Sequence, residues 1–381
     1  MSAEARAGRV ATWLLPPGAA YLGAQVLYWA AADRSGLDYL LVATHARWDS
    51  GIYVAIARRG YWLARCRPGP VNPAAHWCGS AAWFPLYPLG MRLLGALGVP
   101  LGRGGLLLAE ASAFASLLLV WWLLQARPTA TNLGCLALAA VFPGSIYDHA
   151  LFPVSLATAA SLLFLGLLAR DRWAAAGAAG AVAAAAYQTG VLLAGVVPVW
   201  LLWRRRPGLL ARLGQGAATA GLVAAGLLLV AGLQQAQLRH WDGFLLVEAR
   251  YGTGLHNPAV TFAANATAPR RPGTASRLAG LPAPRDQFLL VTGILLLGAA
   301  ATVAAGRPTP LEVVVLADSL LFWLAPLVAG GHVAQYRAQA LLLPSVLLLR
   351  RLPAPVPAIL AAAAAVVAWR MAGLFYHDVL I

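Results

Sequence analysis

The sequence predicts an all-α polytopic membrane protein, and three observations support this fold class. Of the 381 residues, 60% are hydrophobic and only 11% are charged, whereas a soluble domain carries about 25% charged residues. Apolar runs of roughly twenty residues recur, which is the length that crosses a hydrocarbon core. The runs lack the alternation of barrel strands, and lipid offers no partner for backbone groups, so the spans must be helices.

The first apolar segment, residues 10–32, is predicted to be a retained span. It is longer than the apolar region of a cleavable signal, and no convincing small-residue cleavage site follows it. Arg6 and Arg9 precede it, and cytoplasmic loops carry an excess of basic residues. We therefore expect the N-terminus on the cytoplasmic side.

The remaining apolar segments give about eleven spans in total, within one membrane domain over residues 1–381. Their boundaries are defined only to within a few residues. The expected ranges after the first are 104–126, 131–147, 150–169, 173–187, 190–203, 210–236, 287–306, 310–330, 335–350 and 354–375.

Segment 83–98 has two interpretations, a further span or a helix along the membrane surface. If it spans, the basic loops at 125–128 and 169–173 fall outside, against the positive-inside rule. If it lies on the surface and 173–203 is a pair of short helices, these loops join 203–214 on the cytoplasmic side. We favour the surface helix, which also suits its short, proline-interrupted sequence.

This arrangement places most unusual polar residues on one membrane face. The external side then holds a first loop, 33–103, with juxtamembrane helices, and a long loop, 237–286. Loops of that length are usually functional or mobile. Cys66 and Cys78 lie in the first of these loops. They could form a disulfide, which persists outside the cytoplasm, or remain two free thiols.

The formal charge of +15 comes entirely from arginine, because the chain has no lysine. The arginines lie in short loops between spans rather than on one soluble face, which argues against nucleic-acid binding. Anionic lipids and phosphorylated lipid substrates fit better as partners. There is no zinc-type Cys/His spacing, no phosphate-binding or dinucleotide fingerprint and no nucleophile elbow. No metal ligands are assigned, and a divalent cation is left open.

Asp49 is the first candidate for chemistry. Aspartate is suited to cap a helix and Gly60 to end one, so 49–60 is predicted to be a short helix. Asp49 could act only as that cap. It could also be a general base, because partial desolvation at the membrane edge raises the proton affinity of a carboxylate.

Other candidates could bind a substrate or could have ordinary structural roles. Arg47 and Arg58 could hold phosphate oxygens, or could belong to a solvated basic loop. Trp48 and Tyr53 could stack on a sugar, or could form part of an interfacial aromatic belt.

Three more positions each have a functional and a structural interpretation. Asp148 and His149 sit in an apolar turn, where charged groups are functional candidates unless water reaches them. Arg337, preceded by Tyr336, could clamp a lipid phosphate or could be a snorkelling interfacial side chain.

Two motifs of the sequence are specific. Arg47-Trp48-Asp49-Ser50 is followed by Tyr53, Ile56-Ala57 and Gly60-Tyr61, and segment 84–89, which contains Tyr87, reads FPLYPL. The first resembles the first-loop signature of the PIG-V family of GPI mannosyltransferases and their bacterial relatives, and the second resembles the family's next motif. Weaker matches follow in the same order at 142–152, 172–180 and 336–344.

The resemblance implies a GT-C glycosyltransferase in a bacterial plasma membrane, with its site on the extracytoplasmic face. Such enzymes take a sugar, here most simply mannose, from a polyprenyl-phosphate carrier and pass it to a lipid or glycan acceptor. Carried over, Asp49 becomes the general base of an inverting transfer, and Arg337 stabilises the leaving phosphate. The chain departs from the family pattern at Ile52, Asp148 and Gln188, where relatives carry other residues. The resemblance also makes Gln188 a candidate for substrate binding.

Two other functions remain open at this point. A lipid-linked sugar transporter would place polar residues along a path through the bilayer, whereas here they gather at one face. A non-catalytic relative, acting as a partner subunit, would retain the fold without the transfer chemistry.

Overall fold

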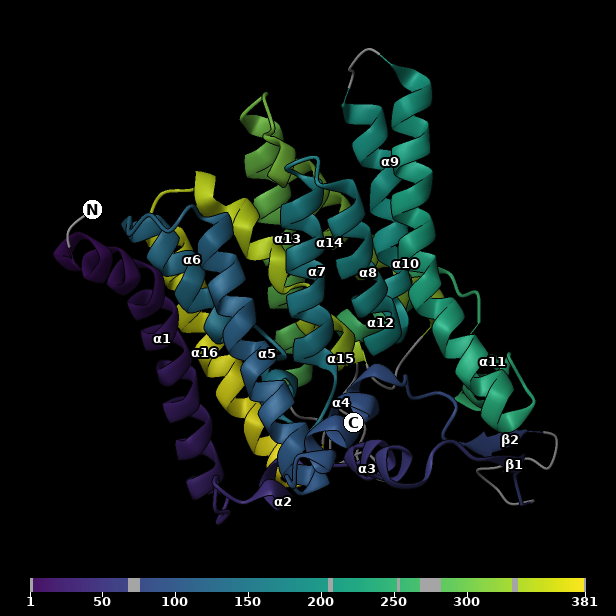
Figure 1. Cartoon of the computed structure of the whole chain (residues 1–381). Helices are drawn as coiled ribbons and strands as arrows, with labels where there is room; N and C mark the ends of the chain where they lie inside the picture. The colour runs from purple at the N-terminus through teal and green to yellow at the C-terminus, as the bar shows by residue number, and fades with distance from the viewer. Residues whose placement is uncertain are drawn as a thin grey trace.

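The computed structural model describes residues 3–67, 76–204, 208–251, 254–267, 282–330 and 335–379. These residues are mostly α-helical (Figure 1). In this part of the chain the strands are β1 (Leu63–Arg65) and β2 (Trp77–Gly79), which pair antiparallel. The all-α prediction is confirmed.

Five helices within the described ranges are long and apolar enough to cross a membrane. They are α5 (Leu101–Leu123), α10 (Leu209–Leu238), α13 (Pro282–Ala304), α14 (Pro310–Ala329) and α16 (Pro355–Tyr376). The N-terminal α1 (Ala3–Arg34) is also long, and carries Pro16 and Pro17 in its interior. The protein is therefore an α-helical membrane protein.

Four shorter apolar helices pack alongside the long ones (Figure 1). They are α6 (Ala130–Ala140), α7 (Val154–Leu168), α8 (Trp173–Ala186) and α9 (Leu193–Trp203). Helix α8 is almost entirely alanine and glycine, and it packs against both α7 and α10. Small residues let helix backbones approach closely in membranes.

Two predicted spans are not single α-helices. Segment 131–147 divides into α6 and a 3₁₀ helix, η1 (Ser145–His149), because Pro143 has no N–H to continue the helix and Gly144 takes φ +96°. Segment 335–350 divides into α15 (Gln335–Ala340) and η4 (Leu343–Arg351), with Pro344 in the first turn of η4.

The structure supports the surface-helix interpretation of segment 83–98. Its helix α4 (Leu86–Ala96) has 11 residues, about 16 Å at 1.5 Å per residue, which is roughly half of a hydrocarbon core. In Figure 1 it lies at the lower end, with α2 (Val42–His45) and α3 (Ser50–Arg59). The expected pair of short helices is also present, with η2 (Gln188–Leu192) between α8 and α9.

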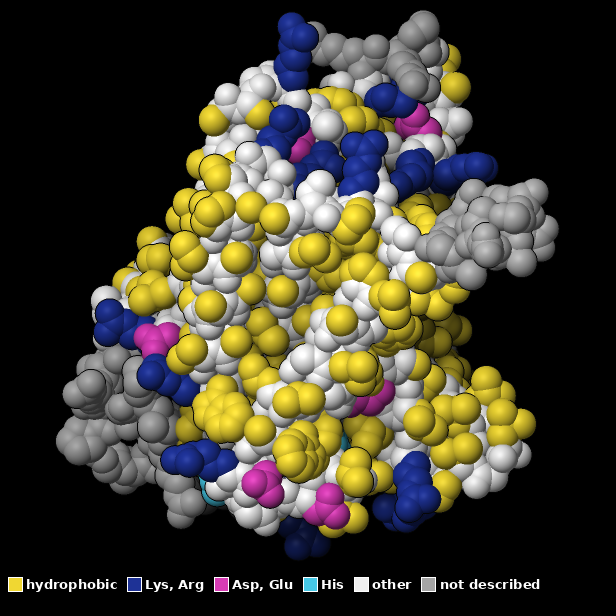
Figure 2. All heavy atoms as spheres, turned by 90° about the vertical axis from the view of Figure 1, so that its left-hand side faces the viewer, with side chains coloured by type: hydrophobic (Ala, Val, Ile, Leu, Met, Phe, Trp, Pro, Cys, Tyr) yellow, Lys and Arg dark blue, Asp and Glu magenta, His cyan; other side chains and the backbone are white. Residues whose placement is uncertain are grey.

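The surface shows a band expected for a membrane protein. In Figure 2 hydrophobic side chains fill the middle of the visible face, while arginines gather above and charges of both signs lie below. The upper end carries the basic connections, such as those following α5, α7 and α13 (Figure 1).

The described residues of the first predicted external loop lie at the lower end, together with the start of the second (Figure 1). A disulfide joins Cys66 to Cys78 across the β1–β2 pair, so the bridge rather than free thiols is found. The long loop 237–286 begins with α11 (Gly243–Glu248) and η3 (Ala249–Tyr251), and continues into α12 (Pro258–Thr267).

Candidate functional site

Asp49 and Arg337 form an ion pair at the lower end of the molecule, although 288 residues separate them in sequence. The Arg337 Nη1 donates to the Asp49 carboxylate. The Asp49 side chain is 20% exposed and that of Arg337 is 12% exposed. The pair is thus largely desolvated yet still open on one side, as a site for a bound substrate requires.

Local backbone strain precedes the acid. Trp48 has φ +41°, in the left-handed region that a bulky side chain rarely adopts. Such conformations cost on the order of 1–3 kcal/mol and cluster at functional sites. The Trp48 ring meets Phe375 of α16 edge to face, with centroids 5.3 Å apart, which holds the turn in this conformation.

The predicted helix after Asp49 is confirmed as α3, and Gly60 ends it at φ +82°. The capping role of the carboxylate is wrong, however. Asp49 occupies the N-cap position, but its side chain makes no capping hydrogen bond and turns to Arg337 instead. The ion pair competes successfully because Arg337 offers a full positive charge in a largely desolvated setting, whereas a backbone N–H offers only a partial one.

Arg337 belongs to α15, which contacts Gln287 of α13 and Gly144. Gln287 of α13 donates to the backbone oxygen of Tyr336 at 3.0 Å and to Gln339 Oε1 at 2.9 Å. Gly144 lies against α15, and a Cβ there would come within 3.0 Å of the Tyr336 oxygen. The Arg337 guanidinium also lies 5.4 Å from the centre of the Phe152 ring.

Tyr53 lies one helical turn after Asp49 and is buried. Burial raises the pKa of its phenol well above the ordinary value of 10.0, the Asp49 carboxylate adds to the rise, and Arg337 opposes it. Tyr53 is thus a neutral aromatic wall of the site. Its ring packs edge to face on Tyr87 and Phe152.

Glu248, at the end of α11, is a site residue that the sequence analysis missed. Burial raises the pKa of its carboxyl to about 7, while the charge of Arg337 opposes the rise and that of Asp49 adds to it. A second acid therefore lies within electrostatic range of the pair. The only sequence signal was a lone glutamate in an apolar stretch of the long loop, FLLVEA.

Three predicted binding residues have other partners or positions. Arg47 Nη2 donates to the backbone oxygen of Tyr376 at 3.1 Å, and its Nε lies 3.5 Å from Asp378, so it anchors the end of α16. Tyr87 is fully buried and donates to the Gly105 oxygen at 2.7 Å. Arg58 is exposed near the far end of α3, about 13 Å along the helix from Asp49.

Asp148 and His149 are both buried, so the interpretation that water surrounds them is wrong. His149 Nδ1 lies 2.9 Å from a carboxylate oxygen of Glu110 on α5. The same oxygen accepts from Tyr21 at 2.7 Å and Gln25 at 2.8 Å, both on α1. This second polar cluster ties three elements together, and Glu110 was overlooked because it lies inside an apolar span.

Gln188 and Tyr336 are each adjacent in sequence to a residue that interacts with the Asp49–Arg337 pair or belongs to it. Gln188 begins η2 directly after Tyr187, a buried residue on which the charges of Arg337 and Asp49 act. Tyr336 precedes Arg337 in α15 and is partly buried. Of the predicted residues, the structure thus gathers Trp48, Asp49, Tyr53 and Arg337 most closely.

Within the described ranges, no group of three or more His, Cys, Asp or Glu side chains could hold a metal ion. The question of a divalent cation, which the sequence left open, stays open. No protein-family model matches the chain, and no curated protein matches it at a significant level. The resemblance to the PIG-V family stays a prediction from the motifs themselves.

Proposed function

We propose that the protein is a membrane glycosyltransferase that moves a sugar, most simply mannose, from a polyprenyl-phosphate carrier to an acceptor hydroxyl. The observation that carries the proposal is the desolvated Asp49–Arg337 pair. It places a carboxylate that can accept a proton beside a guanidinium that can hold a phosphate. The strained Trp48 and the aromatic wall of Tyr53 support a site built for a ligand.

The reaction follows from these two groups. The acceptor oxygen forms a bond to the anomeric carbon while the bond from that carbon to the phosphate oxygen breaks. Asp49 accepts the hydroxyl proton, and the lipid phosphate leaves with the bonding electrons. Arg337 stabilises the charge that develops on this phosphate. A single displacement of this kind inverts the anomeric configuration.

Binding of the donor would also prepare the base. In the structure the Asp49 carboxylate is engaged by Arg337. A donor phosphate would compete for the guanidinium, because bidentate phosphate binding is a preferred geometry of arginine. The carboxylate would then be free for the acceptor hydroxyl, so donor binding would precede activation of the acceptor.

The proposal includes a GT-C-type arrangement of about eleven membrane crossings, with the site on the extracytoplasmic face of a bacterial plasma membrane. Two features support this orientation. Basic connections lie at the end opposite the site. The Cys66–Cys78 disulfide lies at the site's end, and disulfides persist outside the cytoplasm.

The test is transfer from radiolabelled polyprenyl-phosphate-mannose by the purified chain in lipid nanodiscs. Asp49→Asn removes the base and should lower the transfer rate by about a hundredfold or more. Asp33→Asn, an exposed acid at the end of α1, is the matched control and should leave the rate unchanged. Full activity in Asp49→Asn would exclude the base role.

A folding control separates chemistry from stability. Arg337→Gln and Asp49→Asn each break the ion pair, so both should lower the melting temperature to a similar extent. Asp49→Asn should still bind the donor, whereas Arg337→Gln should not. If the purified native chain binds the donor but transfers no sugar, the protein is a non-catalytic relative instead.

A further inference from the structure

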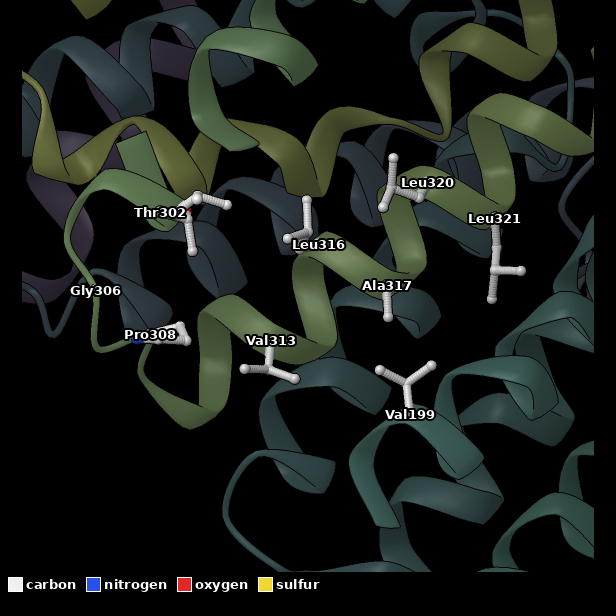
Figure 3. Close-up of a pocket in the computed structure, with 10 residues that line it drawn as sticks. Val199, Thr302, Gly306, Pro308, Val313, Leu316, Ala317, Leu320 and Leu321 are labelled. Atoms are coloured by element: carbon white, nitrogen blue, oxygen red, sulfur yellow. The ribbon is translucent and has the colours of Figure 1, made fainter. Parts of the chain in front are cut away.

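An apolar cavity of about 510 Å³ lies between α9, α13 and α14 (Figure 3), and neither Asp49 nor Arg337 lines it. Its walls come from Val199 of α9, Val303 of α13, and Val313, Leu316 and Leu320 of α14. The volume falls within the ~300–1,000 Å³ of small-molecule sites. Figure 3 shows Val199 and Val313 on facing helices, with the space between them.

The cavity opens to the surface that lipid would cover. Val199 is 40% exposed and Val303 is 72% exposed. Their side chains face a region without charged lining residues. The natural neighbour of such an opening, in a protein that crosses a membrane, is a hydrocarbon chain.

The depth of the cavity matches one leaflet. Its lining begins at Gly306 and Pro308, in the turn between α13 and α14, and reaches Leu321. From Pro310 to Leu321 α14 rises about 16 Å, and half of a hydrocarbon core is roughly 15 Å. The cavity therefore runs from the basic end of the bundle to near the middle of the membrane.

The rim of the cavity is positively charged. Arg307 is exposed and stands between two lining residues, Gly306 and Pro308. Arg351 donates to the Arg307 backbone oxygen at 3.0 Å, and both Arg350 and Arg351 pair with Glu312. The two guanidinium groups of Arg350 and Arg351 thus share one carboxylate, and Arg307 adds a third positive charge nearby, which leaves excess positive charge at the level of the headgroups.

We propose that this cavity binds one acyl chain of an anionic phospholipid from the leaflet on the basic side, with its phosphate at Arg307. The apolar walls, the leaflet-length depth and the rim charge each match one part of that lipid. The site is separate from the transfer chemistry and does not depend on it. A bound lipid would fill the space between α9 and α14 and stabilise their contact.

The test is native mass spectrometry of the full chain with added phosphatidylglycerol or phosphatidylcholine of identical acyl chains. The native chain should retain phosphatidylglycerol more tightly. Val303→Trp places a large side chain at the cavity mouth and should abolish retention of both lipids. Val366→Trp, an equally apolar exposed position on α16, is the control and should retain both.

The headgroup contact is tested separately. Arg307→Gln should weaken phosphatidylglycerol binding about fivefold, because one basic residue near the surface contributes about 1 kcal/mol, and should leave phosphatidylcholine unchanged. Equal retention of the two lipids by the native chain, or unchanged retention in Val303→Trp, would overturn the proposal. So would displacement of the bound lipid by polyprenyl phosphate with loss of transfer in Val303→Trp, since the cavity would then belong to the sugar donor.

Discussion

The carboxylate of Asp49 and the guanidinium of Arg337 stabilise each other where little water reaches them. Removing one partner from such a pair costs more than the pair contributes, because the other charge stays buried and uncompensated. The same surroundings act on Glu248, whose proton is held by burial and released less readily than that of a free glutamate. Whether Glu248 is ionised therefore depends on whether the protein is folded.

Glu248 makes stability depend on pH. Its pKa is raised from 4.5 to about 7 in the folded state, so the unfolded chain loses this proton at lower pH than the folded one. The native chain should lose stability as pH rises from about 4.5 to about 7, with no further change above that.

Thermal unfolding in detergent across this range measures the effect. Glu248→Gln keeps the shape of the neutral acid and removes the ionisation, so its melting temperature should vary less with pH over this window. Parallel curves for the native chain and the variant would show that Glu248 is not the group responsible.

At the scale of elements, close packing of α8 and α10 holds the centre of the bundle. A Cβ added at Gly226 of α10 would come within 2.3 Å of the Ala181 backbone oxygen of α8. No side chain can fit there without moving one helix. At Gly221 of the same helix, a Cβ would meet nothing within 4 Å.

The two glycines form a matched pair. Gly226→Ala should destabilise the protein by about 1–3 kcal/mol, as overpacked cores do. Gly221→Ala should be neutral or stabilising by about 0.5–1 kcal/mol, because alanine favours helix. Chemical unfolding in mild detergent measures both, and equal effects would mean that α8 and α10 are not in this contact.

At the scale of the whole molecule, the proposed orientation puts α3 outside and the basic connections inside. Arg58 near the end of α3 and Arg127 after α5 are both exposed. Of the native cysteines, Cys135 is buried and the other two are bridged. Single introduced cysteines can therefore report the side on which each loop lies.

An impermeant thiol reagent added to intact cells should label Arg58→Cys and leave Arg127→Cys unlabelled. After permeabilisation both should react, which controls for accessibility. The reverse pattern in intact cells would place the Asp49–Arg337 pair on the cytoplasmic side.

The short helix after Asp49 was predictable because glycine termination at Gly60 is a local property, although the carboxylate cap that also suggested it does not form. The ends of α6 and α15 were less so, since the apolar runs continued to 147 and 350 while the helices ended at Ala140 and Ala340. Glu110 and Glu248 were missed because single acids in apolar stretches acquire meaning only from their neighbours.

The sequence by itself determined that this chain is an α-helical membrane protein, because hydrophobicity over one span is a local property. It also determined which end of the molecule is basic and singled out Asp49. Only the tertiary structure decided that Asp49 turns from its own helix to Arg337. That contact joins residues 288 positions apart, and its energy depends on packing that excludes water, which no local pattern encodes.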